Sequence, residues 1–250
     1  MSDAFFYSEQ LADPGATLTL TGDEARHAAV SRRLQVGETL WLFDGRGGLV
    51  RTTLLHITAR GHALDLRVEE RRTEPSPKPA IHLACALPKG DRQGTLLDMA
   101  TQLGMTEFTP LICERSVVRA SSNSAARWLR ICLEACKQSR RPYLPILHAS
   151  ATPQEMVARG TGRAKTVWIA HPSAGAVAVS RAVDQNASAD VTILVGPEGG
   201  FTEEEVAWTA AGGAKQIALG SAILRIETAA VALVAAFALA AGSRTSLGTF

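Results

Sequence analysis

Three charged side chains near the carboxyl end of the chain are of the types that proton transfer and charge stabilisation need. Arg225 and Glu227 stand two residues apart beside a glycine turn, and Glu198 lies inside another such turn. A positioned carboxylate can remove a proton during a reaction, and a guanidinium can stabilise the anion that forms. The alternative is a local ion bridge, which contributes little stability on an exposed surface. We take these three residues as candidate catalytic groups.

Two glycine-containing runs carry these residues. Residues 194–201 and 219–229 each pass from an apolar, strand-like segment through glycine into a helix-like pattern. Parallel sheets bind ligands at the carboxyl ends of their strands, and glycine lets the backbone approach a ligand closely. Neither run matches the Gly-x-Gly-x-x-Gly or Gly-x₄-Gly-Lys-Ser/Thr pattern, which argues against NAD and ATP. An ordinary tight turn is the alternative, but two such runs favour one shared pocket for a flat heteroaromatic ligand.

Positive charge is concentrated in the middle of a nearly neutral chain. Residues 80–150 contain nine Lys or Arg against five Asp or Glu, whereas the whole chain has a net charge of +2. A local basic patch is typical of a protein that binds a polyanion. Helical spacing over 124–139 puts several charges on one face, namely Arg127, Arg130, Glu134 and Lys137. The alternative is an ordinary solvated helix face.

The elements that position these groups fall into two parts. Residues 1–72 contain short alternating strands at about 16–20, 39–43, 50–57 and 62–68 and one helix near 22–30, which indicates a small β-barrel. Residues 73–80 hold three prolines and are predicted to be a linker. From residue 81 strands, among them 166–170 and 191–195, alternate with helices, which predicts an α/β domain with a parallel sheet over 81–250. Thr202 and Glu205 form a capping box that starts one of its helices.

Bulk composition is that of a globular protein with 46% hydrophobic and 20% charged residues. The four cysteines are dispersed and predict packed thiols in a reducing cytoplasm. No signal peptide is recognisable, and the apolar run at 228–242 is shorter than the ~20 residues of a membrane span. The six histidines show neither triad nor metal spacing, so we expect no metal and no membrane association.

The motifs together resemble one family. Leu194-Val-Gly-Pro-Glu-Gly-Gly-Phe-Thr202 followed by Leu219-Gly-Ser-Ala-Ile-Leu-Arg-Ile-Glu-Thr-Ala229 is closely similar to the RsmE family of 16S ribosomal RNA uridine-N3 methyltransferases, in the SPOUT superfamily. The resemblance covers nearly the whole chain. Its further matches are Pro88-Lys-Gly-Asp-Arg92, Glu114-Arg-Ser116, Gln138-Ser-Arg-Arg141 with Pro145, and His27, Arg33, Gly37 and Asp44-Gly45.

The resemblance implies a PUA-like RNA-binding barrel, a methyltransferase domain with a trefoil knot, and a homodimer. It implies methylation of a uridine at N3 in the decoding region of 16S ribosomal RNA of the small subunit, with S-adenosylmethionine as methyl donor. The implied cofactor-binding residues are Ala170, Leu194, Val195, Gly196, Glu198, Gly199, Gly200, Leu219, Gly220, Ile223 and Leu224. The predicted RNA-binding residues are His27, Arg33, Lys89, Arg115, Arg127, Arg130, Lys137, Gln138 and Arg141.

Departures from the family pattern leave alternatives open. Ala222 stands where the family commonly has arginine, Gln102 where it often has glutamate, and Ala4 where it usually has arginine. Loss of two cations concerns RNA contacts more than cofactor binding. A non-catalytic RNA-binding or ribosome-assembly factor and a methyltransferase for another RNA site are therefore the alternative functions.

Overall fold

The structure, a computed structural model, describes residues 4–58, 61–160, 165–186 and 189–242. Contacts divide the chain into two compact units, residues 1–76 with 136–144, and residues 77–135 with 145–250. The sequence analysis placed 136–144 in the C-terminal domain. In the structure this segment joins the first unit because Tyr143 forms a backbone bridge with Arg46 and its hydroxyl donates to the carbonyl of Glu74 at 2.8 Å.

The first unit is built on a five-stranded sheet with the strand order β1-β3-β4-β5-β2. The strands are β1 (Ala4–Tyr7), β2 (Thr17–Thr21), β3 (Thr39–Phe43), β4 (Gly48–Ile57) and β5 (Ala63–Thr73). β1 runs parallel to β3, and the other neighbours are antiparallel. Leucines at alternate positions, such as Leu40 and Leu42, fill the core of the unit. The predicted helix at 22–30 is confirmed as a helical segment in two parts, α1 (Gly22–Arg26) and the π-helical turn η1 (His27–Ser31) that continues it.

The second unit contains a seven-stranded parallel sheet with the order β10-β12-β9-β11-β6-β7-β8. Its strands are β6 (Ile81–Ala86), β7 (Glu107–Leu111), β8 (Ile146–Leu147), β9 (Thr166–Ala170), β10 (Val177–Ala178), β11 (Val191–Val195) and β12 (Lys215–Ala218). Every residue of β6 and β11 is buried. Helices therefore cover both faces of the central strands, as expected for a parallel sheet. This confirms the predicted α/β class.

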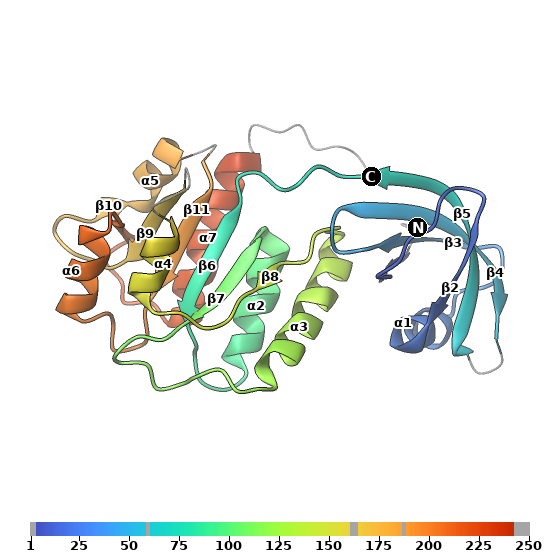
Figure 1. The fold of residues 1–250 in the computed structure, drawn as a ribbon, viewed down its shortest axis with the longest axis horizontal. Helices are drawn as coiled ribbons and strands as arrows, with labels where there is room; N and C mark the ends of the chain where they lie inside the picture. The colour runs from blue at the N-terminus through green and yellow to red at the C-terminus, as the bar shows by residue number, and fades with distance from the viewer. Residues whose placement is uncertain (1–3, 59–60, 161–164, 187–188, 243–250) are drawn as a thin grey trace. The chain divides into compact units, whose positions relative to one another are not determined.

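The described helices α2 to α7, labelled in Figure 1, belong wholly or mostly to this unit. They are α2 (Arg92–Leu103), α3 (Ser124–Ser139), α4 (Pro153–Gly160), α5 (Val179–Asn186), α6 (Glu203–Ala211) and α7 (Ile226–Gly242). α7 packs on β6 and β11 and also contacts α2 and α5. α4 contacts β9 and α6. The capping box of Thr202 and Glu205 at α6 is confirmed. The sequence analysis did not identify α4 and α5, each of only eight residues.

Two expectations about the chain concern its cysteines and membranes. All four cysteines are buried and none is in a disulfide, which confirms packed thiols. Burial raises the pKa of the Cys113 thiol to about 12, so this thiol stays protonated near neutral pH. Within the described ranges, none of the helices has both the length and the apolar character to cross a bilayer. The trefoil knot concerns how the chain threads through its own loops, and it stays a prediction.

Candidate active site

Strand order brings three loops of the second unit to one place. β12, β9 and β11 are neighbours in the sheet, and all three run in the same direction. The segments that follow them, 171–172, 196–201 and 219–224, therefore leave the sheet along the same edge. These include both glycine-containing runs of the sequence. The loop after β9 is the third contributor, and only Ala170 at its start was expected from the sequence.

These loops enclose a cavity of about 220 Å³. Nine of the expected cofactor-binding residues line it: Ala170, Val195, Gly196, Glu198, Gly200, Leu219, Gly220, Ile223 and Leu224. Leu194 is instead fully buried in the hydrophobic core, and Gly199 lies next to the side chain of Arg115. The sequence analysis missed nine further lining residues, which are His171, Pro172, Pro197, Phe201, Ile217, Ala218, Ala222, Ile226 and Ala229. Pro197, Phe201, Ala222, Ile226 and Ala229 lie inside the two glycine-containing runs, and period-two burial could have flagged Ile217, whereas no pattern in the sequence marks Pro172 and Ala218.

The cavity wall depends on glycine at two positions for different reasons. A Cβ atom on Gly196 would lie 2.9 Å from Cε2 of the buried Phe201 ring, closer than real Cβ contacts allow. Gly220 has a φ of 151°, a backbone conformation that residues with side chains rarely adopt. Ile223 is fully exposed although it is apolar, and it borders the cavity. Backbone and apolar side chains thus form a surface suited to an uncharged, flat group.

Arg92 connects the two candidate carboxylates at the polar side of the site. Its guanidinium nitrogens lie 3.4 Å from Glu198 Oε1 and 3.5 Å from Glu227 Oε2. Glu227 is the second residue of helix α7, and its side chain is only 13% exposed. The buried Oε2 atom of Glu227 makes no hydrogen bond within the described protein. An acceptor in this condition can take a proton or a donor from a ligand. Arg92 was quoted in a sequence motif but was not assigned to the site.

Arg225, the candidate cationic group, is exposed immediately before α7. Its carbonyl accepts a hydrogen bond from the amide of Ala229 at 2.9 Å, so it acts as the first acceptor of the helix. The side chain therefore starts from a fixed backbone position next to Glu227. The structure places both residues, together with Glu198 and Arg92, at one end of the sheet.

Arg115 fixes the loop after β11 from outside the cavity. Its Nη1 donates to the carbonyl of Gly199 at 2.8 Å. In the same region, Glu205 Oε1 accepts from the amide of Glu114 at 2.9 Å, while Glu205 also closes the capping box of α6. The segment around residue 115 is thus joined to the glycine loop by one hydrogen bond and to α6 by another. Arg115 supports the cavity wall, and its charge remains at an exposed position.

Helix α3 presents the predicted basic face only in part. Arg127 and Arg130 are exposed, and Trp128 is buried against Phe108, as the spacing predicts. Arg127 also lies 3.6 Å from Asp91, in a surface ion pair. Lys137 differs from the expectation, since its side chain is 6% exposed and its Nζ lies 2.7 Å from Glu24 Oε1. A buried ion pair of this kind occupies the ammonium, and we remove Lys137 from the candidate RNA-binding set.

The other candidate RNA-binding residues are at the surface or close to it. Arg33 and Lys89 are exposed, and so is Gln138, whereas Arg141 is half-buried. His27 is partly buried because its ring packs edge-on against Phe6, with centroids 5.6 Å apart. His27, Arg33, Gln138 and Arg141 belong to the first unit, and Lys89, Arg115, Arg127 and Arg130 belong to the second. Each unit therefore carries part of the expected RNA-binding set.

Comparison with known proteins agrees with this arrangement. Residues 74–238 match the family described as RNA methyltransferase domain, and residues 20–63 match the RNA methyltransferase PUA domain. The chain is 34% identical over 215 residues to the ribosomal RNA small subunit methyltransferase E of Synechocystis, a match that covers 86% of this chain and 70% of the relative. The protein of the same name from Mycobacterium bovis is 32% identical over 238 residues, with coverage of 92% and 89%.

A solved structure of the same family superposes on both units. The ribosomal RNA small subunit methyltransferase E of Neisseria gonorrhoeae, bound to S-adenosyl methionine, gives a TM-score of 0.81 at 29% identity, covering 94% of this chain and 96% of that chain. The predicted PUA-like domain and the family resemblance are confirmed. The protein is an RNA methyltransferase and belongs to the ribosomal RNA small subunit methyltransferase E family.

Proposed function

We propose that the protein transfers the methyl group of S-adenosylmethionine to N3 of one uridine in the decoding region of 16S ribosomal RNA. The observation that carries this proposal is the 220 Å³ cavity walled by backbone and apolar side chains, with Arg92, Glu198 and Glu227 beside it. Adenine is a flat heteroaromatic group that such a wall accommodates. The close approach of Gly196 to the Phe201 ring keeps the space free of a side chain.

Methyl transfer to N3 requires an acceptor for the N3 proton. S-adenosylmethionine, when bound, supplies an electrophilic methyl group on a sulfonium centre. A bond forms between the methyl carbon and uracil N3, the sulfur–carbon bond breaks, and the N3 proton must leave. The buried Oε2 of Glu227 lies 3.5 Å from Arg92 Nη1 and forms no hydrogen bond with the residues that the structure describes, which makes it our candidate acceptor for this proton.

The cations of the site stabilise the negative charge that develops on the uracil ring. Arg225 is exposed beside Glu227 and can donate to a uracil carbonyl. Arg92 holds both carboxylates within 3.5 Å of its guanidinium and so keeps them near one another despite their like charge. Glu198 lines the cavity itself and we assign it to the cofactor as well as to the polar cluster. Alignment of the methyl group with N3 is then the main task of the protein.

Basic and polar side chains carried by each unit would contact RNA. The proposed set is His27, Arg33, Lys89, Arg115, Arg127, Arg130, Gln138 and Arg141. Each phosphate contact would make the affinity more sensitive to salt. The homodimer and the cytoplasmic location implied by the family resemblance also remain predictions. Sedimentation of the purified chain tests the dimer directly.

The deciding experiment follows labelled methyl transfer and cofactor binding in parallel. Small ribosomal subunits or 16S RNA from a deletion strain are incubated with the protein and labelled S-adenosylmethionine, and the product nucleoside is located by mass mapping. We expect one N3-methyluridine in the decoding region. The Arg225→Ala variant should lose transfer but keep calorimetric cofactor affinity, while the exposed control Arg181→Ala keeps both. Absence of cofactor binding at millimolar concentration would refute the proposal and favour a non-catalytic RNA-binding factor.

A further inference from the structure

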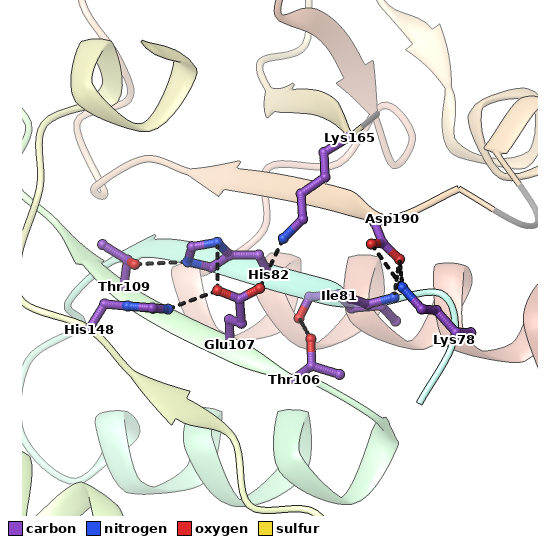
Figure 2. A network of polar contacts seen from close by, with 10 residues as sticks. Lys78, Ile81, His82, Thr106, Glu107, Thr109, His148, Lys165 and Asp190 are labelled. Atoms are coloured by element: carbon purple, nitrogen blue, oxygen red, sulfur yellow. Dashed lines mark hydrogen bonds and ion pairs between the residues drawn. The ribbon is translucent and has the colours of Figure 1, made fainter. Parts of the chain in front are cut away.

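A second polar cluster lies at the opposite end of the same sheet. Figure 2 shows the side chains of His82, Glu107, His148, Thr109 and Lys165 turned toward one another. Four of them, His82, Glu107, His148 and Lys165, border a separate cavity of about 260 Å³, to which Met156, Arg159, Gly160 and Thr192 also contribute. β11 passes between the two cavities, since Thr192 near its start lines this one and Val195 at its end lines the other. The cluster takes no part in the proposed methyl transfer.

Sheet register explains why these residues meet. His82 on β6 is the direct neighbour of Glu107 on β7. His148 directly follows β8, and its amide donates a hydrogen bond to the carbonyl of Phe108 on β7. It therefore lies beside β7 on the side opposite to β6. Thr109 is two residues after Glu107 and therefore points to the same face. Three adjacent strands thus supply one imidazole, one carboxylate and one further imidazole, in a position where backbone pairing limits their movement.

The three ligand-type atoms have distances that suit a small metal ion. Glu107 Oε2 lies 2.8 Å from Nε2 of His148 and 3.7 Å from Nδ1 of His82. All three atoms lie within 4.8 Å of one another. Zinc–nitrogen and zinc–oxygen bonds of about 2.0–2.2 Å in a tetrahedron separate neighbouring ligand atoms by about 3.4 Å. Reaching this geometry would lengthen the 2.8 Å distance by about 0.6 Å, shorten the 3.7 Å distance by about 0.3 Å, and bring the two histidine nitrogens, now within 4.8 Å, to about 3.4 Å of each other.

The outer contacts of the cluster resemble those that orient metal ligands. Thr109 Oγ1 lies 2.8 Å from Nε2 of His82, which directs the other ring nitrogen, Nδ1, toward Glu107. Lys165 Nζ donates to Glu107 Oε1 at 2.9 Å and leaves Oε2 to face the two histidines. Partners of this kind fix the tautomer and the orientation of a ligand. The adjoining cavity leaves room for a water molecule as a fourth ligand.

We propose that His82, Glu107 and His148 form a binding site for a divalent transition-metal ion of the zinc class, which ties the edge strand β8 to β6 and β7. Two imidazoles and one carboxylate favour zinc over magnesium or calcium, which prefer oxygen ligands. The ammonium of Lys165 opposes a dication, so this site is weaker than a closed structural zinc site. The histidines lie 66 residues apart in the chain, which is why their spacing did not indicate a metal site.

Zinc binding to the full-length chain tests the proposal. The protein is stripped with a chelator and titrated with zinc chloride, with magnesium chloride as a separate probe. We expect one saturable zinc per chain and no saturable magnesium. His148→Ala should weaken zinc binding about tenfold or more, and Thr109→Val about tenfold to a hundredfold, the usual effect of losing an outer partner. The control His56→Ala removes an exposed imidazole of the first unit and should bind zinc as the original protein does.

Cobalt(II) provides an independent measurement, because a four-coordinate site gives visible absorption that hydrated cobalt lacks. This absorption should appear in the original protein and in His56→Ala but not in His148→Ala. Circular dichroism shows whether His148→Ala is folded, and His148→Gln takes its place if it is not. The proposal is overturned if zinc does not saturate, if His148→Ala or its replacement binds as tightly as the original, or if His56→Ala loses the ion too.

Discussion

Gly196→Ala tests whether the glycine loop is shaped by the Phe201 ring. The added Cβ would stand 2.9, 3.0 and 3.2 Å from three carbon atoms of this ring. Carbon atoms prefer separations of about 3.5–4.0 Å, so the ring must withdraw by roughly half an ångström. Phe201 is only 5% exposed and belongs to a core cluster that includes Leu194 and Val206. We therefore expect the cost of overpacking, about 2 kcal/mol.

Two assays measure this cost. Denaturant unfolding should show the loss of about 2 kcal/mol, and the melting temperature should fall by about 4–8 °C for a domain of this size. Because Phe201 lines the cavity, calorimetry should also show weaker binding of S-adenosylmethionine, by about tenfold, equivalent to 1.4 kcal/mol. Gly175→Ala is the matched control. Its Cβ meets nothing within 4 Å and its φ is not positive, so stability should change by less than about 0.5 kcal/mol.

A double variant separates the contact from other effects of the methyl group. Phe201→Leu removes ring atoms that the new Cβ would strike, and by itself it costs stability through lost packing. If the ring and the methyl group collide, Gly196→Ala should be less harmful in the Phe201→Leu background, with a coupling of about 1 kcal/mol or more. Additive effects within about 0.5 kcal/mol would refute the reasoning. So would a Gly196→Ala protein as stable as the original.

Three further perturbations have outcomes that the structure specifies. Arg92→Met should slow methyl transfer about a hundredfold while leaving cofactor affinity within about threefold, because it removes the cation between two carboxylates; unchanged turnover at saturating cofactor would contradict this role. Lys137→Met should cost about 3–5 kcal/mol in denaturant unfolding, since it leaves Glu24 partly buried without its ammonium partner, and adding Glu24→Gln should recover part of the loss. Burial lowers the pKa of His82 from 6.5 to about 4. Between these two pH values the imidazole is protonated in the unfolded chain but neutral in the folded one, so the free energy of unfolding of the metal-free protein should fall by about 3 kcal/mol as pH falls from 6.5 to 4. Burial alone would raise the pKa of Glu107, but the Lys165 hydrogen bond and the charge of His82 lower it to about 2, so stability should continue to fall below pH 4.5. In His82→Gln the free energy of unfolding should depend less on pH between 6.5 and about 4.

The elements around the cavity were predictable because their signals are local. The strands at 166–170 and 191–195 and the helix at 124–139 have the bounds that the sequence indicated. Each combines an apolar run or stripe of clear period with a start or stop residue. The helices at 153–160 and 179–186 have two turns each, too few for a period to emerge. Short elements of this kind depend on packing against the sheet rather than on their own pattern.

Site residues that are far apart in the sequence could not be grouped from sequence spacing, because they meet only in the folded chain. Arg92 and Glu227 are 135 positions apart, and they meet because α2 packs against α7. His82 and His148 meet because β7 lies between β6 and β8. Lys137 has the helical position of a surface charge, yet its side chain is buried, with Glu24 of the same unit 2.7 Å from its Nζ. In each case the decisive quantity is strand order or helix packing, which depends on the whole chain. The glycine turns could be predicted from the sequence because each requirement, a positive φ or close packing against a ring, concerns a single residue. A short sequence motif therefore shows them.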